Sequence, residues 1–186
     1  MYKRQVLGLA FVTIMILSSV FAPLVTQYDP QKVDLRMMLK PPSADHILGT
    51  DKIGRDVFAR IIYGGRISIL VGLGSALGAA LIGVSIGAYT AYKGGWLDST
   101  FLRISEVVMS FPQIILVLML VTILGQSLMN LIIIFTLTGW GSLYRLTRAQ
   151  MLSLREEEYV QALRAFGLNT FTICFKHILP NALGPI

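Results

Sequence analysis

Long apolar runs separated by short polar segments dominate the sequence. The first run covers residues 6–25 behind Lys3 and Arg4, the second covers 67–92, and neither contains a charged side chain. A helix that crosses about 30 Å of hydrocarbon needs about 20 such residues, because each residue adds about 1.5 Å. We therefore predict a first transmembrane span within segment 1–25 and a second over 67–92.

A cleaved signal peptide is the alternative interpretation of the first run, because its amino-terminal flank is basic. The run is long for the apolar part of a signal peptide. Pro23, Gln27 and Tyr28 also occupy the zone where small residues would mark a cleavage site. The pattern therefore favours an uncleaved first span.

The third run, residues 107–144, carries no charge over 38 residues and is too long for one span. Gly125-Gln126-Ser127 divides it, which predicts a helical hairpin with spans 107–124 and 128–144. Residues 181–186 are expected to start a fifth span. The predicted fold class is all-α, a polytopic transmembrane helical bundle with four complete spans.

Composition supports a membrane protein and argues against an enzyme. The chain is 54% hydrophobic and only 14% charged, with a mean hydropathy of +0.68. One cysteine, Cys174, excludes an internal disulfide, and His46 and His177 offer no metal-ligand spacing, so we expect no metal and no cofactor. No phosphate-binding glycine loop or nucleophile motif is present, so any ATPase must be a separate chain.

The net charge of +6 does not indicate nucleic acid, because the basic residues flank the apolar runs and suit anchoring at membrane lipid headgroups. No ionisable residue lies deep within a predicted span, which argues against a proton-coupled transporter.

Small residues recur one turn apart in the second predicted span. Gly74 with Gly78 and Gly83 with Gly87 form two G-x-x-x-G pairs, which let a neighbouring helix approach closely. Ordinary helix packing is the favoured interpretation. A helix that lines a transport path is the alternative.

Residues 26–66 are polar and rich in turn signals, and we predict that they form a segment outside the membrane. Within them, 56–66 has apolar residues at helical spacing, which predicts a short interfacial helix. The charges of this segment nearly alternate in sign, as in an internal ion-pair network, and belong to Asp51, Lys52, Arg55, Asp56 and Arg60. A structural clamp is the favoured role, and contact with a substrate-delivering protein is the alternative.

The polar stretch 145–180 is predicted to form two short helices joined at Gly167. Ser153 and Glu156 have the spacing of a capping box, and Gly167 suits a left-handed helix end. Asn169 is expected to cap a second helix that runs from residue 170 until Pro180. Such a hairpin could fit a groove in a partner or pack on the chain's own spans. Its predicted apolar face consists of Tyr159, Ala162, Leu163 and Phe166.

Residues 157–185 resemble the EAA loop of ABC-transporter permeases, in which a Glu-Ala-Ala opening is followed by a glycine and later by I-x-L-P. Here Gln161, Ala162 and Leu163 stand at the opening, and His177 replaces the isoleucine. The resemblance implies a cytoplasmic loop that docks into an ATPase. The implied docking residues are Tyr159, Gln161, Ala162, Leu163, Phe166, Gly167, His177, Leu179 and Pro180.

A second pattern, LGTDxxGRDVxxRxxYGGRxS, resembles the segment before the second span in permeases of the dipeptide/oligopeptide/nickel ABC family, specifically the second permease of the pair. Ser110-Phe111-Pro112 also resembles that family. The residues that carry the first match are Gly49, Thr50, Asp51, Gly54, Arg55, Asp56, Arg60 and Arg66.

The resemblance implies an importer subunit with no enzymatic activity of its own, which moves a peptide or a nickel complex across the inner membrane. The implied partners are a sister permease in a heterodimer, two ATP-binding cassette subunits and an extracytoplasmic solute-binding protein. The amino terminus and the 145–180 loop would be cytoplasmic, and 67–186 would be the permease core.

Family bundles have six spans, so this chain is expected to be a carboxy-terminally truncated member, in which 181–186 only begin a fifth span. A truncated, non-transporting membrane interaction protein, or a gene fragment that keeps the docking loop, is the alternative interpretation.

Overall fold

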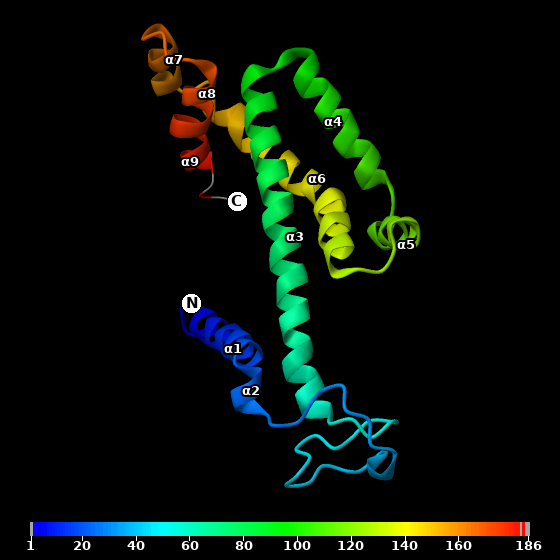
Figure 1. The fold of residues 1–186 in the computed structure, drawn as a ribbon. Helices are drawn as coiled ribbons and strands as arrows, with labels where there is room; N and C mark the ends of the chain where they lie inside the picture. Colours follow the sequence, from blue (N-terminus) through cyan, green and yellow to red (C-terminus); the bar gives the residue numbers. More distant parts are fainter. Residues whose placement is uncertain (1, 183, 185–186) are drawn as a thin grey trace. The chain divides into compact units, whose positions relative to one another are not determined.

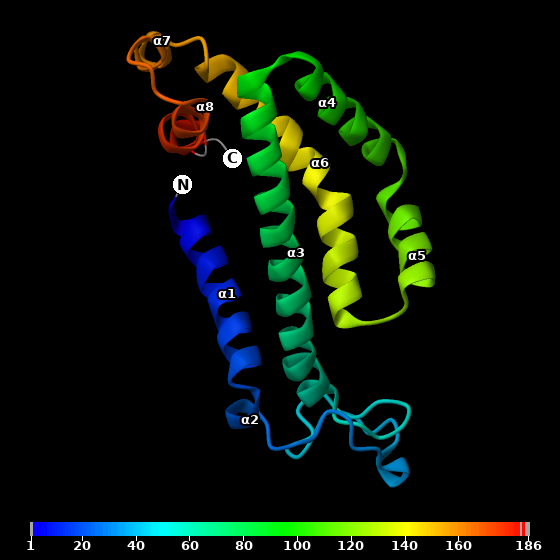
Figure 2. The ribbon, with the colours of Figure 1, turned by 45° about the horizontal axis from the view of Figure 1, so that its top comes forward.

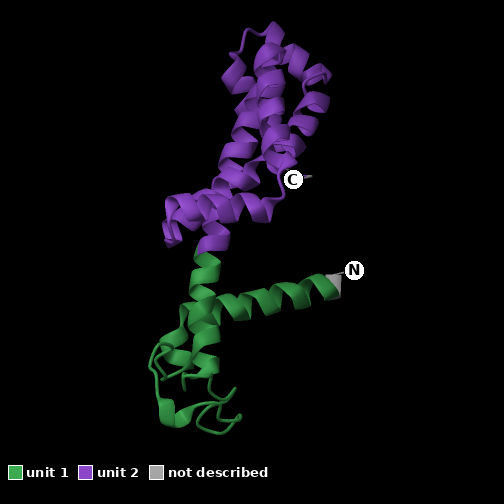
Figure 3. Ribbon diagram, turned by 90° about the vertical axis from the view of Figure 1, so that its right-hand side faces the viewer, with its two compact units in different colours: residues 1–70 green, residues 71–186 purple. Residues whose placement is uncertain are grey.

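The computed structural model describes residues 2–182 and 184, and its fold is all-α (Figure 1). The described part contains no β-strand, only an isolated antiparallel bridge between Thr50 and Asp56. The chain divides into two units, residues 1–70 and 71–186 (Figure 3). The predicted all-α class is confirmed.

The first unit begins with α1 (Tyr2–Val20) and the short α2 (Ala22–Val25). The expected single helix is interrupted at Phe21, because Pro23 has no N–H to bond the Ser19 carbonyl four residues earlier. Arg66 replaces the missing donor. Its guanidinium donates to the Ser19 and Val20 carbonyl oxygens, each at 2.7 Å, and so closes the end of α1.

Loop residues and a 3-10 turn (Leu35–Met37) lead into α3 (Val57–Lys93), a continuous helix of 37 residues. The separate interfacial helix predicted over 56–66 is absent, because these residues are the first turns of α3. Gly64 and Gly65 do not interrupt the helix, and Gly65 lies against the Ser19 side chain. By length and composition, α3 is the one helix in the described ranges that could cross a membrane alone.

The second unit contains the rest of α3, followed by α4 (Gly95–Ser110), α5 (Gln113–Leu124) and α6 (Leu128–Leu154). Helix α6 contacts α3 as well as α4 and α5 (Figure 2). A small core of Ala79, Trp140 and Tyr144 lies between these helices.

The predicted span 107–124 is not one helix. Helices α4 and α5 meet at a bend of 90°, with the break at Phe111 and Pro112. Pro112 disfavours helical geometry at the residue before it, and Phe111 is accordingly extended, with φ −87° and ψ 138°. The pair meets the length and composition of a membrane span only when both helices are taken together. Helix α4 itself was not predicted.

Helix α6 continues ten residues past the predicted end of its span at 144. Ser153, the expected cap of the next helix, therefore lies inside the last turn of α6. The residue that precedes α7 (Glu158–Ala165) is Glu157, and its side chain makes no capping bond.

The carboxy-terminal helical segment consists of α8 (Thr170–Thr172), a π-helical stretch (Ile173–Ile178) and α9 (Leu179–Ala182). Pro180 does not end it as predicted, because the π-helical stretch widens the preceding turn and tolerates a residue without an N–H. Of the fifth span expected over 181–186, residues 183, 185 and 186 lie outside the described residues.

Candidate functional site

Residues 158–182, here called the coupling hairpin, fold around a tight turn at Gly167. Gly167 has φ +75°, its N–H donates to the Arg164 carbonyl at 2.9 Å, and the Leu168 N–H donates to Leu163 at 3.3 Å. These two bonds are the Schellman arrangement that satisfies the last carbonyls of a helix. Asn169 then caps α8, because its Oδ1 accepts from the Thr172 N–H at 2.7 Å.

One face of the hairpin is built into the protein. Val160, Ile173, Cys174 and Ile178 are fully buried, or nearly so, against the end of α3 and the last turns of α6. Figure 1 shows α7 to α9 beside that end of α3. Val160 was not among the predicted residues of the hairpin, although it lies three residues before Leu163, on the same side of α7.

Burial raises the pKa of the Cys174 thiol to about 11. A desolvated thiol in an apolar core stays protonated at neutral pH and behaves as a small hydrophobic side chain. Cys174 therefore belongs to the packing of the hairpin.

Arg155, just before the hairpin, and Arg164, within it, bind the end of α3. Arg155 donates from Nη1 to the Ala91 carbonyl at 2.8 Å, where the helix leaves its last carbonyls without internal partners. Arg164 donates from Nε to the Tyr92 hydroxyl at 3.1 Å, and its guanidinium carbon lies 5.0 Å from the centre of the Tyr92 ring. These contacts hold a short helical element in a defined place.

The other face of the hairpin is exposed and aromatic. Phe166 is 81% exposed, Phe171 63% and Tyr159 39%. The predicted apolar face is thus divided, because Leu163 packs inward. Of the remaining predicted docking residues, Gln161, Ala162, Gly167 and Pro180 are exposed, and His177 and Leu179 are half-buried.

Replacing Gly167 with alanine should destabilise the hairpin by about 1 kcal/mol, because a β-carbon disfavours the left-handed conformation. No atom lies within 4 Å of the position of that β-carbon, so the effect comes from the backbone alone. Gly167→Asn is the matched control, since asparagine tolerates positive φ. Limited proteolysis at 165–169 measures the difference, and equal cleavage of both variants would contradict it.

The four glycines of the predicted packing pairs all face α6. Gly74 lies against Ile132, and Gly78 against Thr136. A β-carbon at Gly83 would lie 2.6 Å from the Trp140 carbonyl oxygen, and one at Gly87 would lie 2.8 Å from the Tyr144 carbonyl oxygen. The two helix backbones therefore touch at Gly83 and Gly87.

An ion pair that was not predicted from the sequence joins α4 to α6. Arg148 binds both oxygens of Asp98, with Nε–Oδ1 at 2.7 Å and Nη2–Oδ2 at 2.6 Å. The Tyr144 hydroxyl donates to the Asp98 backbone carbonyl at 3.4 Å. This hydrogen-bonded carboxylate raises the pKa of Arg148, so the arginine stays charged. The pair fixes the start of α4 against α6 just before the coupling hairpin.

In the first unit, Asp51 organises the predicted ion-pair network. Its carboxylate accepts from the backbone N–H groups of Ile53 and Arg55, from Arg55 Nε at 2.8 Å and from Arg60 Nη1 at 2.6 Å. Desolvation opposes ionisation, but these hydrogen bonds together hold the pKa of the Asp51 carboxyl well below its usual range. The loop therefore closes on a carboxylate that remains charged at neutral pH.

Asp56 links the loop to α3. Its Oδ1 accepts from the Ala59 N–H at 2.6 Å, as an N-terminal cap does, and its Oδ2 lies 2.8 Å from His46 Nδ1. The Thr50 hydroxyl donates to the Met37 carbonyl and accepts from the Lys40 N–H at 2.9 Å.

Glycine is required at two turns of this loop. Gly49 and Gly54 have φ +72° and +77°, and β-carbons there would meet the carbonyl oxygens of Lys40 and Asp34. Most motif residues of this segment thus make contacts within the loop and with the beginning of α3, whereas Arg66 binds the end of α1.

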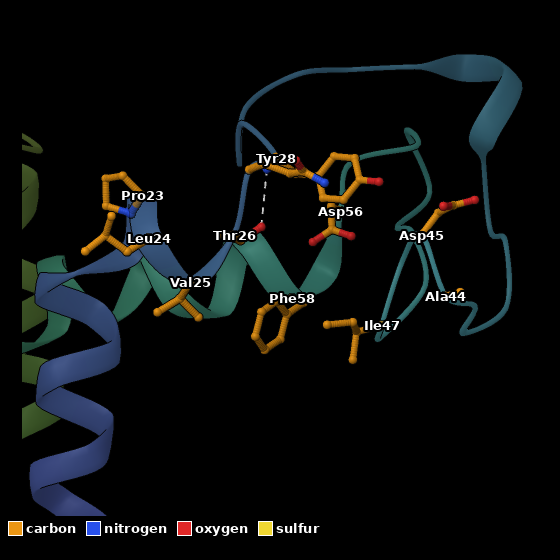
Figure 4. Close-up of a pocket in the computed structure, with 11 residues that line it drawn as sticks. Pro23, Leu24, Val25, Thr26, Tyr28, Ala44, Asp45, Ile47, Asp56 and Phe58 are labelled. Atoms are coloured by element: carbon orange, nitrogen blue, oxygen red, sulfur yellow. Dashed lines mark hydrogen bonds between the residues drawn. The ribbon is translucent and has the colours of Figure 1, made fainter.

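A pocket of about 300 Å³ lies beside this loop (Figure 4). Its lining includes apolar side chains such as Ile47 and Phe58. Five side chains that can act as hydrogen-bond donors or acceptors also line it, namely Thr26, Gln27, Tyr28, Asp45 and Asp56. Asp56 already bonds His46 and the start of α3, so it serves the fold. The second unit holds a pocket of about 330 Å³ at the bend between α4 and α5.

Residues 79–186 match the family described as "Binding-protein-dependent transport system inner membrane component". Residues 3–42 match the family described as "N-terminal TM domain of oligopeptide transport permease C". The two matches include the coupling hairpin and the first apolar run, respectively.

Relatives align with nearly the whole chain. The oligopeptide transport system permease protein OppC of Bacillus subtilis (strain 168) is 40% identical over 184 residues, which is 99% of this chain and 60% of the relative. The dipeptide transport system permease protein DppC of Alkalihalophilus pseudofirmus is 41% identical over the same coverage. The B. subtilis DppC is 40% identical, with 58% of its length covered. This chain spans about 60% of the length of these relatives.

Proposed function

Because the chain belongs to the family of binding-protein-dependent inner-membrane transport components, we propose that it is a permease subunit of a peptide importer. The names of its relatives, which are oligopeptide and dipeptide transport permeases, support peptide as the solute. We expect no catalytic activity from this subunit itself. ATP would be hydrolysed by separate ATP-binding cassette subunits that dock on the coupling hairpin.

One observation carries this proposal, namely the division of the coupling hairpin into a packed face and an exposed aromatic face. Phe166 is 81% exposed and Phe171 is 63% exposed. Large aromatic side chains that are exposed together on one element indicate an interaction surface. Aromatic side chains on a rigidly held element are suited to fill a groove in a partner. The buried face and the two arginine contacts would transmit movement of the ATPase to α3 and α6.

The proposed topology and partners rest on the same family membership. We place the amino terminus and the 145–180 loop on the cytoplasmic side, with further spans near α1, α4–α5 and α6. The partners would be a sister permease, two ATPase subunits and an extracytoplasmic solute-binding protein. The loop organised by Asp51 and Asp56 would lie outside the membrane, where its internal bonds favour a structural role.

Replacing Phe166 with serine should weaken ATPase binding by about tenfold or more, because an exposed aromatic anchor would be lost from the interface. The matched control is Trp96→Ser, which removes an aromatic side chain that is 77% exposed on α4, outside the hairpin. Co-purification of the ATPase subunits with the full assembly is the measurement, and peptide uptake by cells is the second readout.

Both variants should insert in the membrane in normal amounts, since neither side chain is packed in the core. Equal ATPase recovery with Phe166→Ser and Trp96→Ser would contradict docking at the hairpin. Normal recovery without any peptide uptake by the unaltered assembly would instead contradict peptide as the solute.

A further inference from the structure

The 90° bend between α4 and α5 forms one wall of a pocket in the second unit. The pocket holds about 330 Å³ and is lined by residues of both helices and by α6. Its volume lies in the range of small-ligand sites in proteins. All of the lining residues fall within 107–144, the stretch that contains no charged side chain.

An interrupted helix in such an apolar stretch has a physical consequence. The backbone leaves helical geometry at Phe111, and Pro112 has no N–H, so the last carbonyl groups of α4 lose the N–H partners that a continuous helix would supply. The Pro112 carbonyl accepts from the Ile115 and Leu116 N–H groups of α5. In a membrane, irregular backbone is tolerated where it is covered by protein or lines a water-filled cavity. Broken helices of this kind supply solute sites in transporters, because they bring backbone and side-chain polar groups to a cavity.

Three hydrogen-bonding side chains line the pocket. The hydroxyls of Thr138 and Ser142, one turn apart on α6, donate to the Ile134 and Gly139 carbonyls and leave their oxygen lone pairs free to accept. Gln113, at the start of α5, is exposed and makes no side-chain hydrogen bond within the described ranges. Its amide can therefore donate and accept at the same time.

We propose that this pocket, here called the bend pocket, binds a peptide group of the transported peptide, with the Gln113 amide pairing to the backbone amide. The proposal rests on the proposed function of peptide import. A peptide group presents one N–H donor and one C=O acceptor, which the Gln113 side chain complements. The absence of charge among the lining residues makes a carboxylate, an ammonium or a bare metal ion a poor occupant.

The other residues that line the bend pocket can accommodate different side chains of a bound peptide. Val108, Met109, Phe111 and Leu116 line the pocket, and Phe111 is 54% exposed. The Met109 side chain packs against Gly141, where a β-carbon would lie 3.3 Å from its Cγ. An unbranched methionine adapts to differently shaped neighbours. The bend pocket would accordingly recognise the peptide backbone and tolerate many side chains.

The test compares two substrates in proteoliposomes that hold the complete assembly with its binding protein. The probes are trialanine and its analogue in which one backbone amide is replaced by an ester, which removes a single N–H donor. The ratio of their uptake rates is measured for the unaltered chain and for Gln113→Leu. Because the binding protein is the same in all assays, its own preference cancels when the ratios are compared.

The Gln113→Leu variant should lower the amide-to-ester uptake ratio roughly fivefold, the effect of one net hydrogen bond. Thr138→Val should lower uptake of both probes, whereas Thr122→Val should change neither. Thr122 is the matched control, since its hydroxyl also donates to a carbonyl four residues earlier but lies outside the pocket. A photoreactive benzoylphenylalanine should crosslink to labelled trialanine when it replaces Gln113 and not when it replaces Thr122.

An unchanged ratio in Gln113→Leu, together with equal crosslinking at both positions, would overturn the bend pocket as a peptide site while import itself continued. Failure of the unaltered assembly to import either probe would instead count against the proposed function. Membrane insertion of Gln113→Leu in normal amounts and co-purification of the ATPase subunits with it verify that the variant is folded and assembled.

Discussion

Replacing Gly83 with valine is expected to disrupt the packing of α3 on α6, whereas Gly72→Val in the same helix should leave it intact. A β-carbon at position 83 would lie 2.6 Å from the Trp140 carbonyl oxygen and 2.9 Å from the Tyr144 amide nitrogen. Both are backbone atoms, so no side-chain rotation relieves the clash, and overpacking of this kind typically costs about 1–3 kcal/mol. At Gly72 no atom lies within 4 Å of the added carbon.

Thermal unfolding of the detergent-solubilised protein measures this difference, with the fluorescence of Trp140 as the local signal. Trp140 packs edge-on against Tyr144, with ring centres 5.6 Å apart, so separation of the helices would change its surroundings. Equal unfolding temperatures for Gly83→Val and Gly72→Val would show that α3 and α6 do not depend on this contact.

The glycine contacts illustrate what the sequence could predict. The spacing of Gly74, Gly78, Gly83 and Gly87 was sufficient to expect a close helix contact. It did not identify α6 as the partner, because the partner depends on how the helices cross. Asp98 and Arg148 were missed for a related reason, since fifty residues separate them in the sequence and no local pattern connects them.

Helix boundaries were predicted less well than helical character. Spans 1–25 and 107–124 were predicted from the lengths of the apolar runs. The helices break near Pro23 and Pro112, because proline has no N–H and disfavours helical geometry at the preceding residue. At α6 the predicted span ended at residue 144, whereas the helix continues to Leu154. Polar residues end an apolar run without ending a helix.

The coupling hairpin shows a further limit of sequence patterns. Gly167 and Asn169 were predicted in their capping roles, because these roles depend on local backbone chemistry. The sequence did not show which side chains of the hairpin face the core and which face outward. Helix α7 has only eight residues and carries apolar side chains around much of its circumference. Only the core contacts distinguish buried Val160 from exposed Phe166.

Removing one partner of the Asp98–Arg148 pair should destabilise the second unit by about 3 kcal/mol, because Asp98→Ala leaves the Arg148 charge largely desolvated and unpaired. The two side chains are 12% and 24% exposed, respectively, and share two hydrogen bonds. Glu106→Gln is the matched control on the same helix, since its pair with Arg103 is exposed and should contribute less than about 1 kcal/mol. Urea or thermal unfolding in detergent gives both values.

The double variant Asp98→Leu with Arg148→Met separates the charge effect from packing. Apolar side chains of similar size should recover most of the stability lost in Asp98→Ala, because no buried charge then lacks a partner. ATPase co-purification should nevertheless stay reduced in the double variant if the ion pair also fixes the direction in which α6 leads into the coupling hairpin. Full recovery of both stability and ATPase binding would limit the pair to a packing role, and an Asp98→Ala variant as stable as Glu106→Gln would remove it from the core of the fold.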